Sequence, residues 1–143
     1  MHGATFETQQ DRARESETLA LLCKEKGLTY KLNDKYNIVD ASLYKDGKLV
    51  AIAEVKTTHK IAYHDAKQAV YIALKKIYGL QKRSVEQRVP CCIVFRFKDC
   101  IGYFFLHELY DALCGYTKRG RRDGSLYDRE LVLLIRKEQF TLI

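Results

Sequence analysis

The chain has 143 residues, of which 47% are hydrophobic and one is proline, so it is long enough to bury a sizeable core in one domain spanning residues 1–143. Its formal net charge of +7 favours nucleic acid or an anionic membrane surface as partner. There is no run of about 18 apolar residues, which excludes a transmembrane helix. Residues 1–14 lack the apolar core of a signal peptide, so we expect an intracellular protein.

The first half of the chain is predicted to form a helix followed by three strands. Thr8 is the expected N-cap of the helix and Gly27 its stop. The predicted ranges are a helix over Thr8–Lys26 and strands over Leu28–Leu32, Tyr36–Tyr44 and Lys48–Thr57.

The second half is predicted to add a second long helix and more strands. The helix carries small and branched apolar residues at helical spacing, and Gly79 is expected to end it: Ala66, Ala69, Val70, Ala73, Leu74 and Ile77. The predicted ranges are a helix over His64–Leu80, strands over Cys91–Phe97 and Ile101–Leu106, a short helix over His107–Cys114, a basic loop over Thr117–Gly124 and a strand over Glu130–Ile135.

The five cysteines are Cys23, Cys91, Cys92, Cys100 and Cys114. Their number is odd and no C-x-x-C spacing occurs, which is untypical of zinc or iron–sulfur sites. We expect reduced cysteines that serve as small apolar core residues.

The hairpin around Asp46-Gly47 determines which side chains share a face. With a two-residue loop, Asp40 would lie opposite Ala53, so Asp40 and Glu54 would point to different faces. A three-residue loop over Lys45–Gly47 would instead place both carboxylates on one face. If the carboxylates share a metal, the three-residue loop or an equivalent bulge is predicted.

Glu54-Val55-Lys56 places two charged side chains at the end of an otherwise apolar strand. Residues two apart on a strand point to the same face, and charges there are costly to bury unless they are paired or bind a metal. Asp40 and Glu54 are hard oxygen ligands suited to Mg²⁺ or Mn²⁺. Lys56 beside them suits a cation that orients an attacking water or neutralises charge on a phosphate. This set favours phosphodiester hydrolysis.

The pattern resembles the PD-(D/E)XK, or restriction-endonuclease-like, nuclease superfamily. Asn37-Ile38-Val39-Asp40 followed by Glu54-Val55-Lys56 matches its motif, with Val39 at the position of the name-giving proline, and the resemblance covers about residues 10 to 97. It implies an α/β fold with an α-β-β-β-α-β core, a central mixed sheet and flanking helices. It also implies a divalent metal at Asp40 and Glu54, with Lys56 as the catalytic lysine.

Many members of the superfamily add a glutamate from the first helix. Glu15 and Glu17 both flank the expected position, and Glu15 shares its helical face with Leu19 and Leu22. Some members carry Q-x-x-x-Y on the second helix. Gln68 and Tyr71 here stand one residue too close for that pattern, but Gln68 stays a candidate site residue.

The basic loop supplies the candidate DNA contacts, because arginine and lysine bind phosphates without reading sequence. Its cations are Lys118, Arg119, Arg121 and Arg122. We therefore expect a Mg²⁺-dependent (or Mn²⁺-dependent) DNA endonuclease of structure-specific or phage-related type, acting as a homodimer without a membrane partner. It would act in the cytoplasm or nucleoid, or in the host cell if the protein is viral. The alternatives are a Holliday-junction resolvase-type nuclease and a non-catalytic nucleic-acid-binding module on the same fold.

Overall fold

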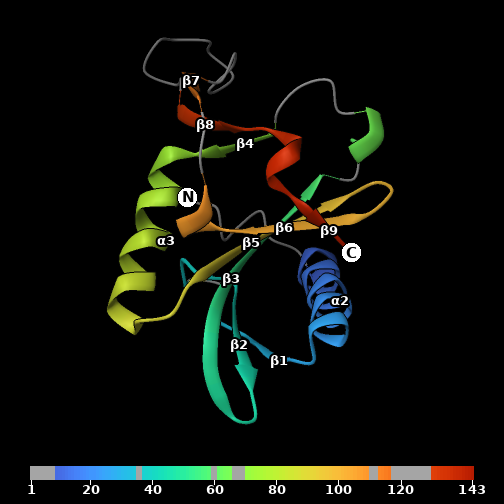
Figure 1. Cartoon of the computed structure of the whole chain (residues 1–143), viewed down its shortest axis with the longest axis vertical. Coiled ribbons are helices and arrows are strands. Elements are labelled where there is room, and N and C mark those ends of the chain that lie inside the picture. The colour runs from blue at the N-terminus through green and yellow to red at the C-terminus, as the bar shows by residue number, and fades with distance from the viewer. Residues whose placement is uncertain (1–8, 35–36, 59–60, 66–69, 110–112, 117–129) are drawn as a thin grey trace.

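The computed structural model describes residues 9–34, 37–58, 61–65, 70–109, 113–116 and 130–143. In this part of the chain, six strands form a main sheet in the order β1-β2-β3-β5-β6-β9, and three form a smaller sheet in the order β4-β8-β7 (Figure 1). The main-sheet strands are β1 (Thr29–Leu32), β2 (Ala41–Lys45), β3 (Lys48–Thr58), β5 (Cys91–Phe97), β6 (Ile101–Phe105) and β9 (Thr141–Leu142). The smaller sheet contains β4 (Val70–Ala73), β7 (Leu113–Tyr116) and β8 (Leu131–Ile135).

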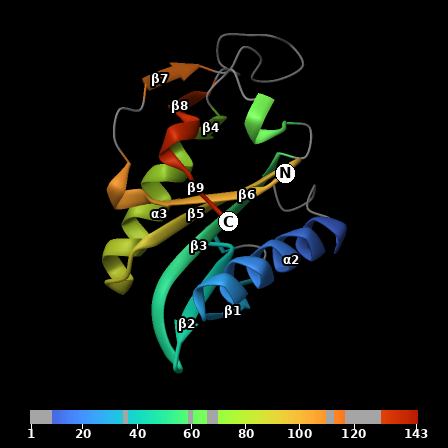
Figure 2. The ribbon, with the colours of Figure 1, turned by 45° about the vertical axis from the view of Figure 1, so that its right-hand side comes forward.

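Two helices cover opposite faces of the main sheet. Helix α2 (Gln9–Lys26) lies on one side of β3 and β5, and helix α3 (Leu74–Gln87) lies on the other (Figures 1 and 2). β3 and β5 run parallel, whereas the other neighbouring strands of this sheet pair antiparallel. This is the predicted mixed sheet between helices.

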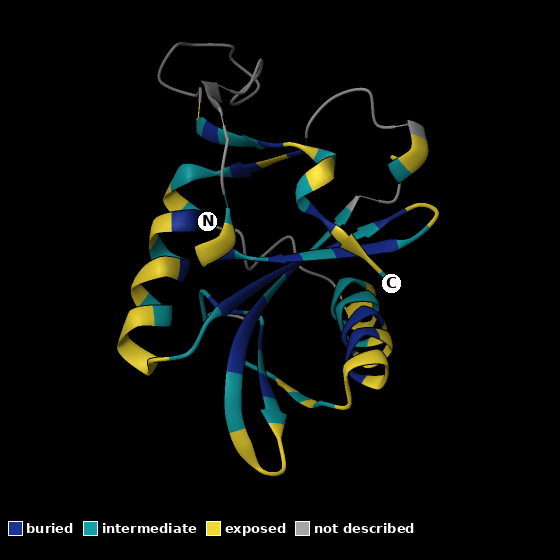
Figure 3. Ribbon diagram, in the orientation of Figure 1, coloured by how far each residue is buried: buried dark blue, intermediate teal, exposed yellow. Residues whose placement is uncertain are grey.

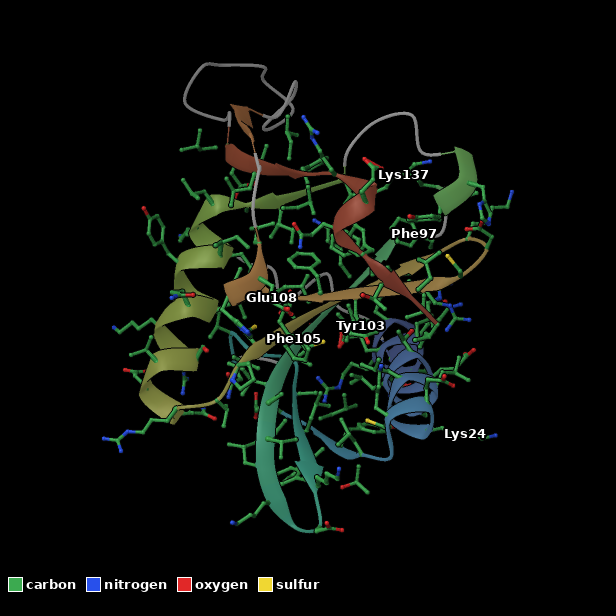
Figure 4. All side chains as sticks on the ribbon, in the orientation of Figure 1. Lys24, Phe97, Tyr103, Phe105, Glu108 and Lys137 are labelled. Atoms are coloured by element: carbon green, nitrogen blue, oxygen red, sulfur yellow. The ribbon has the colours of Figure 1, made fainter. Side chains whose placement is uncertain are left out.

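Each face of the main sheet has its own buried core, and the buried residues concentrate along the central strands (Figure 3). On the α3 side, Phe95 and Phe97 pack edge-to-face against Phe140, with ring centroids 5.1 and 5.4 Å away (Phe97 is labelled in Figure 4). On the α2 side, Leu19 and Leu22 of the helix are fully or almost fully buried. Burying a side chain of this kind contributes about 1.5–3 kcal/mol.

The hairpin between β2 and β3 has a two-residue loop and, further along the strands, a bulge. Asp46 and Gly47 both have positive φ, 52° and 79°, and Lys45 pairs with Lys48, so the loop has two residues. The predicted three-residue loop is wrong. A bulge follows, because Leu43 and Tyr44 are consecutive while their partners, Ala51 and Leu49, enclose one extra residue on β3. The predicted alternative of an equivalent bulge is confirmed.

The bulge changes which residues meet across the hairpin. Beyond it, Ala41 pairs with Ala53, so the register brings Asp40 level with Glu54 instead of Ala53. The strand predicted over Tyr36–Tyr44 is shorter than expected, because β2 begins only at Ala41. Residues 37–39 form a bend in which the Asn37 side chain accepts the backbone N–H of Val39 at 2.9 Å, an Asx-type turn that competes with the strand.

The second predicted helix is wrong in its boundaries. A 3-10 turn spans Tyr63–Asp65, β4 occupies Val70–Ala73, and α3 begins at Leu74 and continues to Gln87. Val70, Tyr71 and Ile72 are β-branched or aromatic and alternate in burial, so pairing with β8 overrides their helical spacing. Ala66 and Ala69 lie outside the described residues, as do Thr8 and the loop cations.

Gly79 lies inside α3 instead of ending it. A Cβ at this position would collide with the Ile38 side chain, so glycine here allows the helix to approach the 37–40 segment. The helix stops where Arg88 adopts a left-handed conformation (φ 57°), two residues before Pro90. The predicted helix over His107–Cys114 is also wrong. A 3-10 turn over Leu106–Glu108 is followed by β7, which pairs with β8.

The cysteines that the structure describes in full are free thiols. Cys91 and Cys92 are adjacent and buried, but Cys91 belongs to the core under α3 and Cys92 to the core under α2. Burial raises the pKa of each to about 12. Separately, none of the described helices is both long and apolar enough to cross a membrane.

Candidate active site

Strand β3 presents Glu54 and Lys56 on the α3 side of the sheet. Its side chains alternate between the two cores, with Ile52 in the core under α3 and Ala53 and Val55 in the core under α2. Glu54 and Lys56 continue the Ile52 face toward the end of the strand. The Glu54 side chain is only 15% exposed, so a carboxyl group is held next to the apolar core under α3.

Asp40 reaches β3 from the residue just before β2. Its Oδ2 accepts the backbone N–H of Val55 at 2.8 Å, beyond the last β2–β3 residue pair at Ala53. The Asp40 carbonyl accepts the backbone N–H of Asn33 at 2.9 Å, and the Asn33 amide donates to the Val39 carbonyl at 3.2 Å. Asn33 therefore fixes the backbone that presents Asp40.

The two carboxyl groups influence each other directly. Burial and the neighbouring Asp40 carboxylate raise the pKa of Glu54, the Lys76 ammonium lowers it, and the net result is about 9. Glu54 Oε1 is buried, and no described residue satisfies it with a hydrogen bond, although Lys76 Nζ lies 3.3 Å away. Lys76 therefore forms an ion pair with this oxygen without hydrogen-bond geometry. A divalent cation bound between Glu54 and Asp40 would stabilise the buried oxygen further.

The donor set fits a divalent cation with oxygen preference. Asp40 and Glu54 provide two carboxylates, and Mg²⁺ sites commonly use one or two carboxylates with waters and substrate phosphate completing the shell. No cluster of three or more His, Cys, Asp or Glu side chains exists in the described part of the chain, so a site made only of protein ligands is not found there. Glu54 Oε1 is buried without a hydrogen bond from the described residues, which is the arrangement expected of an oxygen that binds a cation.

Lys56 is held beside the carboxylates by the smaller sheet. Its Nζ donates to the Tyr71 carbonyl of β4 at 3.3 Å and lies 5.2 Å from the centre of the Tyr71 ring. Burial lowers the pKa of Lys56, against the carboxylates of Glu54 and Glu130, which raise it. A lysine with a lowered pKa releases a proton more readily than an exposed one.

Lys76 is a site residue that the sequence did not reveal. It lies in the first turn of α3, and its Nζ donates to the Ile38 carbonyl at 2.7 Å while lying 3.3 Å from Glu54 Oε1. In the sequence it belongs only to the basic pair Lys75-Lys76. Finding it required the true start of α3 at Leu74, because that boundary decides which lysine faces the sheet.

The two first-helix candidates, Glu15 and Glu17, belong to the helix that covers the other face of the sheet. Helix α2 packs over the face that carries Ala53 and Val55. Glu17 Oε1 pairs with Arg96 Nη2 at 3.2 Å, so the structure joins Glu17 to that face and not to Glu54. Glu15 is half-buried one turn before Leu19, and its role as a site residue stays a prediction. Gln68 and the four cations of the 117–124 loop lie outside the described residues.

The fold can be compared with those of solved protein structures. The chain is similar in structure to Hjc, a Holliday junction resolvase from Archaeoglobus fulgidus, with a TM-score of 0.59 and 9% identity over 92% of this chain and 90% of that chain. That similarity shows the fold, which is the restriction-endonuclease-like fold of PD-(D/E)XK nucleases. No curated protein matches the sequence.

The family match is more specific. Residues 1–143 match the family described as "Phage putative PDDEXK endonuclease", and the chain belongs to that family. The predicted resemblance, the fold class and the nuclease function are confirmed.

Proposed function

We propose that this protein is a Mg²⁺- or Mn²⁺-dependent DNA endonuclease that hydrolyses phosphodiester bonds with Asp40, Glu54 and Lys56. The observation that carries the proposal is the buried Glu54 Oε1, which has no hydrogen bond from a described residue and lies in a site shared with Asp40. The family description supports the endonuclease class. The net charge of +7 supports a nucleic-acid substrate.

Each residue has a distinct task in this proposal. Asp40 and Glu54 would hold the divalent ion, which when bound supplies a Lewis acid and lowers the pKa of water. Lys56, positioned by the Tyr71 carbonyl, would orient the attacking water or neutralise charge that develops on the phosphate. Lys76 would hold the 37–40 segment against Glu54 through the Ile38 carbonyl.

Cleavage assays test the proposal directly. Supercoiled, linear and four-way-junction DNA would be incubated with the protein in Mg²⁺, in Mn²⁺ and in EDTA. We expect cutting only with metal, and a loss of about 10²-fold or more for Asp40→Asn and for Lys56→Gln. Lys48→Gln at the exposed hairpin tip is the matched control and should cut like the wild type. Absence of metal-dependent cutting on all three substrates would refute the proposal.

The assay with four-way-junction DNA tests a second candidate function, that of a Holliday-junction resolvase-type nuclease, which the structural similarity to Hjc favours. This candidate predicts preferred cutting of the four-way junction over the linear duplex of the same sequence. It also predicts a homodimer, because resolving a junction requires two symmetric cuts. Light scattering would measure the dimer. We further propose that the enzyme acts inside the cell, which for a phage protein is the host cell.

A further inference from the structure

A polar cavity lies at the same end of the sheet as the candidate active site, but on the face covered by α2. Its volume is about 290 Å³. The lining residues come from α2, from the end of β3 and from the end of β5: Arg14, Glu17, Thr57, Arg96, Phe97 and Lys98. Three cations and one carboxylate line the cavity, and Arg14 also pairs at 3.7 Å with Asp11, which is not part of the lining. The remaining excess of positive charge suits an anionic ligand.

The cavity is close to the candidate active site along β3. Thr57 directly follows Lys56 and points to the opposite face. A strand rises about 3.3 Å per residue, which puts Thr57 about 10 Å beyond Glu54. A duplex advances about 3.4 Å along its axis per nucleotide, so a phosphate within about three nucleotides of a bond cut at Glu54 can lie at this distance. Because β3 and β5 end together, one nucleic-acid strand crossing this edge can reach both faces.

Arg96 is fixed in the cavity from below. Its Nη1 donates to the Thr18 hydroxyl at 3.3 Å, and that buried hydroxyl itself donates to the Arg14 carbonyl at 2.8 Å. The Arg96 side chain is 32% exposed, so the guanidinium is held in place while part of the side chain stays accessible to solvent. A guanidinium fixed in this way is prepared for an oxyanion at low entropic cost.

Arg96 already pairs with a carboxylate in the cavity. Arg96 Nη2 and Glu17 Oε1 are 3.2 Å apart, and the Glu17 side chain is 62% exposed. An exposed ion pair of this kind contributes little stability, about 0–1 kcal/mol, so it can be exchanged. Arginine binds carboxylate and phosphate with the same fork of N–H donors. Glu17 therefore occupies the position that a phosphate on Arg96 would take.

We propose that this cavity binds a backbone phosphate of the nucleic-acid substrate, and that the phosphate displaces Glu17 from Arg96. The inference rests on the proposed nuclease function and adds a substrate contact outside Asp40, Glu54 and Lys56. It also gives Glu17 a different role from that of a metal ligand, because a carboxylate paired with Arg96 weakens phosphate binding.

Equilibrium binding in EDTA tests the cavity without cleavage. Fluorescence anisotropy with a labelled duplex and a labelled four-way junction would be measured from 50 to 200 mM salt. Arg96→Gln and Lys98→Gln should each weaken binding about 5-fold or more and lower the salt dependence by about one phosphate contact. Glu17→Gln should tighten binding several-fold. Lys48→Gln, which removes one charge at the far end of β3, is the control for net charge.

The outcomes separate the two proposals. If both cavity variants bind as tightly and with the same salt slope as Lys48→Gln, or if Glu17→Gln binds no tighter, the cavity assignment is wrong, even when the protein cuts DNA. If binding depends on the cavity as expected but no substrate is cut with metal, the nuclease proposal is wrong and the cavity assignment stands. Lys98 is exposed, so its variant stays informative if Arg96→Gln disturbs the packing of α2.

Discussion

Replacing Glu54 with glutamine should stabilise the metal-free protein, and the gain should grow with pH. In the folded protein the pKa of Glu54 is raised to about 9 by burial and by Asp40, from an ordinary value of 4.5. In the unfolded chain the carboxyl returns to that ordinary value. Folding therefore requires Glu54 to take up a proton at any pH between the two values.

The difference between the two pKa values determines how the folding stability of the wild type changes with pH. Below about pH 4.5 the carboxyl is protonated in both states, and its contribution is fully favourable. Above that pH the unfolded chain gains stability by ionising, so the wild type loses about 1.4 kcal/mol per pH unit until the folded group also ionises near pH 9. Between pH 5 and pH 8 the loss amounts to about 4 kcal/mol. Glu54→Gln lacks this titration.

Urea unfolding in EDTA at pH 5, 6, 7 and 8 would measure the difference between the two chains. The advantage of the glutamine variant should increase steadily over this range. A divalent ion at 100 times its dissociation constant should then stabilise the wild type at pH 8 by about 2.7 kcal/mol and leave the variant unchanged. A pH-independent difference between the two chains would show that Glu54 is ionised in the folded protein and would refute the reasoning.

Three further changes test the surroundings of the site. Lys76→Met removes the cation that lowers the pKa of Glu54, so calorimetric Mn²⁺ binding should move to higher pH. An unchanged pH profile would contradict this. Deleting Val50 removes the extra residue of the bulge but keeps Ala41 opposite Ala53 and Asp40 level with Glu54. Metal should therefore still raise the melting temperature of this variant. Loss of that response would show that the pairing of β2 with β3 does not determine whether Asp40 and Glu54 share a face. Gly79→Ala should destabilise the protein by about 1–3 kcal/mol in urea unfolding, because its Cβ would collide with the Ile38 side chain, although alanine has the better helix propensity. Adding Ile38→Ala to this variant should recover most of the lost stability. No recovery would exclude the clash as the cause.

Sequence reasoning succeeded where one local signal dominated. β3, β5 and β6 are runs of branched and aromatic residues bounded by turns, and the structure places them within one residue of the predicted ranges. The alternation of side chains along the two strands of the hairpin also predicted that a bulge was needed if Asp40 and Glu54 were to share a face with a two-residue loop. It could not locate the bulge, because nothing about Val50 in the sequence distinguishes it from its apolar neighbours.

The region between β3 and β5 could not be predicted in the same way. Val70–Ala73 fit a helical stripe and a strand equally well, and only pairing with the distant β8 decides between them. That one decision moved the start of α3 and brought Lys76 to Glu54. Likewise, the pairing of Glu17 with Arg96 depends on which face α2 covers, a tertiary fact that helical periodicity alone does not contain.

The adjacent thiols Cys91 and Cys92 can each report when a helix separates from the main sheet and exposes the core beneath it. Only a thiolate reacts with alkylating reagents, and with a pKa of about 12 roughly one thiol in ten thousand is ionised at pH 8. Cys91 reports the layer under α3 and Cys92 the layer under α2, although one peptide bond joins them. Comparing their alkylation rates therefore tells which helix separates from the sheet first, and whether bound metal or DNA slows one layer more than the other.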